Sequence, residues 1–140
     1  MKTLKDLKER LIQEEGLRLK PYRCTANKLT IGIGRNIEER GITEDEAMYL
    51  LNNDVEMVLD ELYDNFNWLA SIDVTARMIL IDMAFNMGVP RLLNFKNTLR
   101  YLENKEYLKA SVEMLDSRWA AQVGKRAKDL SNLMASIDEK

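Results

Sequence analysis

The segment from Val74 to Met87 limits the possible folds of this chain more than any other, because nearly every position in it is apolar. A helix over these residues has no polar face to turn toward water, so it belongs at the centre of a core. Asp73 stands where such a helix begins. Gly88 and Pro90 end it, because glycine adopts a cap conformation and proline cannot continue a helix. We therefore predict a core helix over residues 74–87.

Two further segments carry a helix-start signal followed by an apolar stripe. Thr3 and Thr43 each precede an acidic residue by three positions, which is the spacing of a capping box. The first stripe predicts a helix from about Leu4 to Glu14 with Gly16 as its cap, and the second predicts a helix over about 43–65. The second helix is longer than a small sheet needs, so we expect it to join two lobes. Shorter amphipathic helices are predicted at about 98–102, 105–115, 119–122 and 125–136.

Residues 17–41 favour strands and turns, and we predict a hairpin with a third strand there. In a strand over residues 29–34, alternation sends three apolar side chains to one face and Thr30, Gly32 and Gly34 to the other. The glycine face is then a bare ledge that a flat polymer can approach closely, with Thr30 as its polar side chain. Alternatively, the glycines mark bulges or a close contact with a helix.

These elements predict an α+β architecture in a single domain of 140 residues. A small β lobe covers about 15–42, a connecting helix about 43–65, and a larger helical lobe about 66–140 together with the N-terminal helix 3–14. A cleft between the two lobes is the natural ligand site in such an arrangement.

Composition removes several kinds of chemistry. The chain has no histidine and a single cysteine, so it can form no Ser-His-Asp triad, no Cys-His pair, no imidazole metal site and no intramolecular disulfide. Acid and base catalysis must then come from carboxylates, a lysine, a tyrosine or the thiol. We expect neither a metal nor a cofactor.

The charge pattern bears on partners. A net charge of −2 argues against a dedicated nucleic-acid binder. Four cations nevertheless gather in the C-terminal quarter, where they form either a solvated helix face or a surface for an anionic polymer such as nucleic acid or cell wall: Arg118, Lys125, Arg126 and Lys128. No apolar run reaches eighteen residues and the first dozen positions do not resemble a secretory signal, so we expect a soluble cytoplasmic protein without a membrane span.

Glu15 is the strongest candidate for acid catalysis. Counting about 100° per residue from Leu4, Glu15 falls on the apolar stripe of the first helix. Burial and the helix C-terminus both disfavour negative charge there, so the carboxyl group is expected to be protonated. A protonated carboxylic acid is what a glycosidic leaving oxygen requires. The alternative is a buried ion pair with Arg18 or with an arginine of the helical lobe.

Other polar and aromatic residues support two interpretations each. Cys24 is expected to be a small buried hydrophobe, because without histidine it is a poor candidate for a protease-like nucleophile. Phe85, Asn86 and Trp119 are of the types that hold sugars by stacking and hydrogen bonding. Taken singly, Phe85 and Trp119 are more typical of a core.

Several strings of residues, at their mutual spacing, closely resemble one known family. They are Glu14–Lys20 with Tyr22, Leu29–Gly34, Gly41–Ala47, Phe85–Gly88, Asn97–Arg100, Ser117–Trp119 and Arg126–Lys128. The resemblance is to the phage-type lysozymes, the muramidases and endolysins of glycoside hydrolase family 24, and it spans nearly the whole chain. It implies a lysozyme-like fold.

The resemblance also implies roles for individual residues. Glu15 corresponds to the catalytic acid and Thr30 to a residue that positions water. The second acidic position of well-known members falls on Cys24, as it does in other similar endolysins, so the carboxylate spacing that separates inverting from retaining enzymes cannot be used. Cys24 and Thr30 then orient the attacking water, or the thiolate acts as base or nucleophile; we favour the first.

Four residues are implied as substrate contacts: Arg35, Phe85, Asn86 and Thr98. Arg35 stands where relatives often carry histidine. A contact between Glu15 and Arg35 would favour the ionised carboxylate and so oppose the effect of burial.

The implied function is hydrolysis of the β-1,4 bond between N-acetylmuramic acid and N-acetylglucosamine in bacterial peptidoglycan, leading to lysis of the host cell. We expect a monomer that stays in the host cytoplasm until a holin-type membrane protein releases it to act on the wall in the periplasm. A lytic transglycosylase and a non-catalytic peptidoglycan-binding module are the alternatives.

Overall fold

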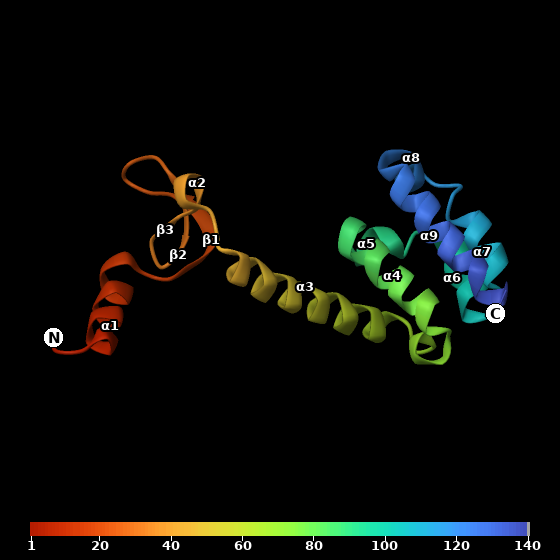
Figure 1. Cartoon of the computed structure of the whole chain (residues 1–140), viewed down its shortest axis with the longest axis horizontal. Coiled ribbons are helices and arrows are strands. Elements are labelled where there is room, and N and C mark those ends of the chain that lie inside the picture. Colours follow the sequence, from red (N-terminus) through yellow and green to blue (C-terminus); the bar gives the residue numbers. More distant parts are fainter. Residues whose placement is uncertain (140) are drawn as a thin grey trace. The chain divides into compact units, whose positions relative to one another are not determined.

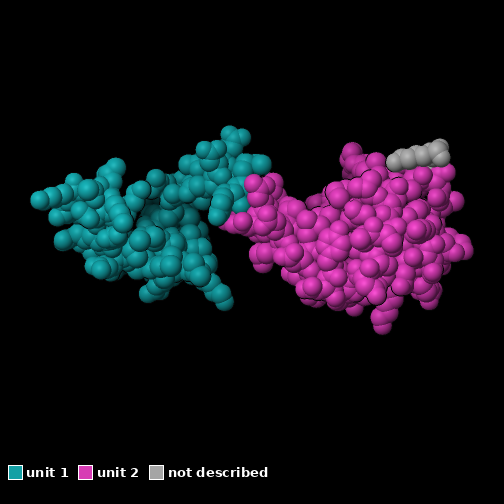
Figure 2. Space-filling view, turned by 90° about the horizontal axis from the view of Figure 1, so that it is seen from below, with its two compact units in different colours: residues 1–49 teal, residues 50–140 magenta. Residues whose placement is uncertain are grey.

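A computed structural model describes residues 1–139 of the chain. The chain divides into two compact units, Met1–Tyr49 and the residues from Leu50 onward (Figure 2). The boundary falls inside the long helix α3 (Glu44–Asn65), which therefore contributes residues to both units. A capping box begins this helix as predicted, because the Thr43 hydroxyl accepts from the Glu46 N–H and the Glu46 carboxylate accepts from the Thr43 N–H.

Unit 1 contains a small antiparallel sheet in the strand order β1–β2–β3 (Figure 1). Its elements are α1 (Leu4–Glu15), β1 (Arg18–Arg23), β2 (Leu29–Gly32), β3 (Arg35–Asn36) and the short helix α2 (Ile37–Arg40). Thr30 is paired on both sides, with Tyr22 of β1 and with Asn36 of β3. The predicted hairpin with a third strand is confirmed.

The predicted strand over residues 29–34 is too long by two residues. β2 ends at Gly32, and Ile33 and Gly34 form the turn into β3. Gly32 and Gly34 have φ angles of 73° and 70°, a region that glycine enters without the steric cost that a Cβ imposes. Ile33 is consequently 44% exposed and does not belong to a packed strand face, so the predicted alternation is wrong at this position.

Helix α1 forms where the sequence predicts it. The Thr3 hydroxyl accepts a 3.1 Å hydrogen bond from the Asp6 N–H, and Gly16 follows the helix with a φ of 77°. The helix contributes no buried residue to the structure. The predicted assignment of this helix to the helical lobe stays a prediction.

Unit 2 is a helical bundle around one apolar core. After α3 come η1 (Leu69–Ser71), α4 (Val74–Met87), α5 (Val89–Leu92), α6 (Lys96–Glu103), α7 (Tyr107–Glu113), α8 (Arg118–Val123), α9 (Lys125–Ala135) and η2 (Ser136–Glu139). Helix α7 packs against both α6 and α9 (Figure 1). Helix α4 is the core helix that the sequence predicts, since it buries Ile79, Leu80 and Met83 completely or nearly so.

The small sheet and the larger helical part confirm an α+β, lysozyme-like fold. The short helices α2 and α5 were not predicted, because four residues are too few to show a helical period. Within residues 1–139, no helix combines the length and the apolar character that crossing a membrane requires.

Candidate active site

The Glu15 carboxyl group rests on the backbone of Gly34. Glu15 is the last residue of α1, and Gly34 lies in the turn between β2 and β3. A Cβ atom added to Gly34 would lie only 2.6 Å from Glu15 Oε2 and 2.9 Å from its Cδ. Only a residue without a side chain therefore leaves room for the carboxyl group. Of the two interpretations of the glycines, the close helix contact is the one found at Gly34.

Glu15 is exposed in the structure. Within unit 1 the apolar face of α1, including Leu7 and Leu11, contributes no buried residue, so unit 1 alone does not bury Glu15 as expected. Among the described residues of unit 1, Glu15 makes no salt bridge, so the alternative of an ion pair with Arg18 is not found. A pair with an arginine of the helical lobe stays a prediction. Within unit 1, the carboxyl group is open to solvent.

Cys24 begins the loop between β1 and β2. Its N–H donates 3.0 Å to the Lys28 carbonyl, and the Asn27 N–H donates 2.8 Å to the Cys24 carbonyl, with Asn27 at a φ of 60°. The partly buried thiol has a pKa below its ordinary value, first because the Lys28 N–H stabilises the thiolate and next because of the Thr30 hydroxyl and the Ala26 N–H. The loop therefore places several hydrogen-bond donors around the sulfur.

Thr30 is only 2% exposed, and its hydroxyl donates 2.8 Å to the Lys28 carbonyl. The expectation that Thr30 is the polar side chain of an open ledge is wrong, because its side chain is buried and its hydroxyl bonds the Lys28 carbonyl of the Cys24 loop. A hydroxyl carries one hydrogen, so it donates either to the Lys28 carbonyl or to the Cys24 thiolate. Thr30 thus lies against the cysteine loop, where it can stabilise the thiolate when the thiol ionises.

Arg35 forms a salt bridge with Glu46. Two parallel hydrogen bonds of 2.9 and 2.7 Å join the guanidinium to the carboxylate, and Arg35 also donates 3.1 Å to the Gly41 carbonyl. The suggested Glu15–Arg35 contact is therefore not made within unit 1, whereas the expectation that Arg35 contacts substrate stays a prediction. The Arg35 guanidinium, followed by the Thr43 N–H, lowers the pKa of Glu46 from 4.5 to about 2.

This depressed pKa predicts an acid-sensitive contribution to folding. The Glu46 carboxylate stabilises the folded chain above about pH 4.5, and the contribution is lost as the pH falls toward 2. The difference in unfolding temperature between the parent chain and Glu46→Gln should therefore be constant above pH 5 and shrink between pH 4.5 and 2. Thermal unfolding followed by circular dichroism measures it, with Glu44→Gln in the same helical turn as control. A difference that persists unchanged at pH 2 would contradict this account.

In unit 2, Asn86 and Trp119 are joined by a hydrogen bond. The Trp119 indole N–H donates 2.8 Å to Asn86 Oδ1, and the indole is 4% exposed while Asn86 is exposed. Because its oxygen is occupied, the Asn86 amide presents its NH₂ group as a donor for a ligand. Trp119 is a core residue that orients the amide. Phe85, which is 42% exposed, lies at the surface rather than in the core.

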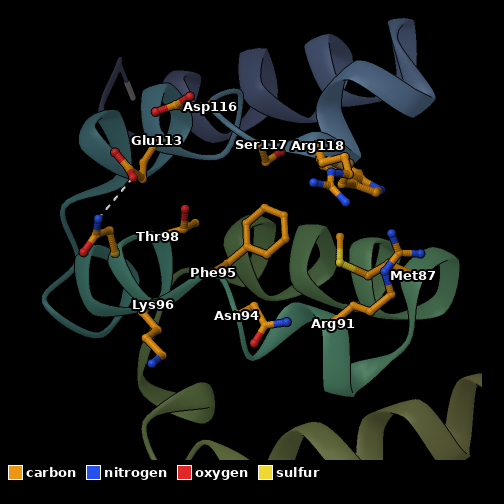
Figure 3. Close-up of a pocket in the computed structure, with 12 residues that line it drawn as sticks. Met87, Arg91, Asn94, Phe95, Lys96, Thr98, Glu113, Asp116, Ser117 and Arg118 are labelled. Atoms are coloured by element: carbon orange, nitrogen blue, oxygen red, sulfur yellow. Dashed lines mark hydrogen bonds between the residues drawn. The ribbon is translucent and has the colours of Figure 1, made fainter.

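Thr98 lines a pocket of about 430 Å³ that lies wholly within unit 2 (Figure 3). The Phe95 ring and the Thr98 side chain point into this space, which Ser117 and Arg118 close on the opposite side (Figure 3). On one wall, Asn97 Nδ2 donates 3.2 Å to Glu113 Oε1. The sequence singles out Thr98, Arg118 and Trp119, but it does not bring them together in one pocket, because α6, α7 and the start of α8 meet only in the folded bundle.

Two of the four C-terminal cations already have acidic partners. Lys125 pairs with Asp129 and Arg126 with Asp82, each at 2.7 Å. These pairs favour the interpretation of a solvated helix face over that of a polyanion-binding surface.

The small sheet with a larger helical part is a lysozyme-like α+β fold, and an exposed carboxyl group lies against the Gly34 backbone beside that sheet. The comparisons agree with this class. The model of the phage lysozyme family matches residues 12–135. Two relatives from Dictyostelium discoideum, probable T4-type lysozyme 2 and probable T4-type lysozyme 1, are each 28% identical over 95% of this chain and 93% of their own length. The chain belongs to the phage lysozyme family, and membership indicates a glycoside hydrolase of the lysozyme type.

Proposed function

We propose that this protein hydrolyses the β-1,4 bond between N-acetylmuramic acid and N-acetylglucosamine in bacterial peptidoglycan, with Glu15 as the general acid. The observation that carries the proposal is the close contact of the Glu15 carboxyl group with the backbone of Gly34. A carboxyl group that is exposed, lies against the Gly34 backbone and has no ion pair within unit 1 can reach the glycosidic oxygen and, when protonated, give it a proton. Departure of that oxygen as a hydroxyl group is what makes cleavage fast.

The water that completes the reaction is placed by Cys24, with Thr30 acting through it. Three donors lower the pKa of the Cys24 thiol and so favour its ionisation, and the sulfur can accept a hydrogen bond from water. The buried Thr30 hydroxyl donates to the Lys28 carbonyl when Cys24 is a thiol, and it can donate to the sulfur when Cys24 is a thiolate. The thiol thus takes the place of a second carboxylate.

The substrate contacts that we propose in unit 2 are Asn86, Phe85 and Thr98. The Asn86 amide offers its NH₂ group, since Trp119 occupies its oxygen. The exposed Phe85 ring offers an apolar face of the kind on which sugars stack. The pocket that contains Thr98 is large enough for a further part of the polymer.

In a phage or prophage setting, this activity would serve lysis of the bacterial host. We propose that the enzyme waits in the cytoplasm and reaches the periplasmic wall when a holin-type protein opens the inner membrane. No part of the chemistry in unit 1 depends on that route.

Mass spectrometry of muropeptides released from purified peptidoglycan in ¹⁸O-labelled water tests the proposal. Hydrolysis is expected to yield reducing muramic acid ends that carry one ¹⁸O atom. Unlabelled anhydro-muramic ends would instead establish a lytic transglycosylase. Sedimentation with the wall without any released product would establish a binding module. Either of these outcomes would overturn the proposed reaction.

A further inference from the structure

One carboxylate of α2 contacts both ends of the loop that carries Cys24. Glu38 Oε1 accepts 2.9 Å from Arg23 Nη1, on the strand side that precedes the loop, and 3.4 Å from the Leu29 N–H, on the side that follows it. Glu38 Oε2 lies 3.6 Å from Lys28 Nζ. A single side chain therefore joins the last residue of β1 to the first residue of β2.

Lys28 and Arg23, the two cations that Glu38 contacts, each make a further polar contact. Lys28 Nζ lies 2.9 Å from Glu39 Oε1, and Arg23 Nη1 donates 3.3 Å to the Asn27 carbonyl inside the loop. Helix α2 thus binds the loop through two successive glutamates. The Leu29 N–H, followed by the charges of Lys28 and Arg23, lowers the pKa of Glu38, so the carboxylate is ionised at neutral pH.

Lys28 links the contacts of Glu38 to the site residues Cys24 and Thr30. Its carbonyl accepts from both the Cys24 N–H and the Thr30 hydroxyl, and its own N–H faces the Cys24 sulfur. A shift of Lys28 would move all three contacts together. Hydrogen bonds weaken steeply with misalignment, so even a small displacement would change the surroundings of the thiol.

We propose that Glu38 is a positioning residue for the reaction, which holds Lys28 and thereby places the Cys24 thiol and the Thr30 hydroxyl. This proposal rests on the proposed function, because it concerns the same site. Glu38 acts through the loop and touches neither substrate nor the reacting atoms.

Two effects of removing Glu38 would move the Cys24 pKa in opposite directions. The charged groups around the loop are Arg23, Lys28, Glu38 and Glu39, all at least partly exposed. Losing the Glu38 charge alone would leave more positive charge near the thiol and lower its pKa. Losing the position of Lys28 would remove the N–H that contributes most to the stabilised thiolate and so raise the pKa. We expect the second effect to win, because solvent screens the exposed charges.

The test compares Glu38→Ala with Asp129→Ala in the full chain. Asp129 also forms an exposed ion pair, at 2.7 Å from Lys125, but it lies in α9 of unit 2. Alkylation by iodoacetamide as a function of pH reports the Cys24 pKa without ambiguity, since the chain has one cysteine. Release of reducing ends from peptidoglycan gives kcat, and circular dichroism gives the unfolding temperature.

For Glu38→Ala we expect the alkylation midpoint to move to higher pH and kcat to fall by about tenfold or more, while Asp129→Ala matches the parent chain in both. An unchanged or lowered alkylation midpoint overturns the proposal, and so does a shifted midpoint with unchanged kcat. If Glu38→Ala fails to fold, Glu38→Gln carries the test, because the amide keeps an oxygen for the Leu29 N–H but loses the ion pairs with Lys28 and Arg23, and we expect shifts in the same directions. A parent chain that releases no product would refute the proposed function, a result that is read separately from the alkylation curve.

Discussion

Replacing Glu15 with glutamine is expected to lower the rate of peptidoglycan cleavage by about 100- to 10,000-fold. Glutamine has the same shape as glutamate but cannot give a proton to the leaving oxygen. The folded structure should be unaffected, since Glu15 is exposed and makes no salt bridge among the described residues. Release of reducing ends measures the rate, and the unfolding temperature checks the fold.

Glu14→Gln is the matched control for this substitution. Glu14 is the neighbouring residue in α1, is also exposed, and pairs with Arg10 at 2.7 Å. The control removes a carboxylate from the same helix end without touching Gly34. If both variants keep the parent rate, or both lose it equally, Glu15 has no special role and the assignment of the acid is wrong.

The second large effect is expected from Gly34→Ala, which should reduce cleavage by about 100-fold or more. The added Cβ would lie 2.6 Å from Glu15 Oε2, closer than real Cβ contacts come, so the carboxyl group must move away. Displacements of about 1 Å at a reacting group are enough to cost about two orders of magnitude in rate. The left-handed φ of 70° also strains alanine and should lower the free energy of unfolding by about 1–2 kcal/mol.

Gly41→Ala separates the collision from the backbone strain. Gly41 has a φ of 65° in the same unit, and a Cβ added there meets no atom within 4 Å. With a ψ of −150°, Gly41→Ala should lose at least as much stability while it keeps its activity. An equal loss of activity in the two variants would show that strain alone disturbs the site, which would remove the argument that Gly34 seats the acid.

The features that the sequence predicts well depend on local signals. The capping threonines, the apolar segment of α4 and the stop at Gly88 each act within a few residues, and all are found where expected. The hairpin with a third strand is also found, although β2 ends two residues before the predicted strand does, and the turn at Ile33 and Gly34 is not predicted.

The features that were missed depend on residues far apart in the chain. Arg35 meets Glu46, and Glu38 meets Arg23, only after α2 and α3 have formed around the sheet. Alternation predicts which side chains share a face of the strand, but it does not predict which residues cover that face, so the burial of Thr30 is missed. The resemblance to a family implied the catalytic role of Glu15 and the selection of Thr98. The contact between Glu15 and Gly34 could be seen only in the structure.

The central claim, that Glu15 supplies the proton to the leaving oxygen, is tested most directly by the dependence of the Glu15→Gln defect on the leaving group. The parent chain and the variant would be compared on a peptidoglycan oligosaccharide, whose sugar leaving group needs a proton, and on an aryl glycoside with a nitrophenolate leaving group, which departs without one. We expect a defect of at least about 100-fold on the oligosaccharide and less than about tenfold on the aryl glycoside. An equal defect on both substrates would contradict the role of Glu15 as the acid.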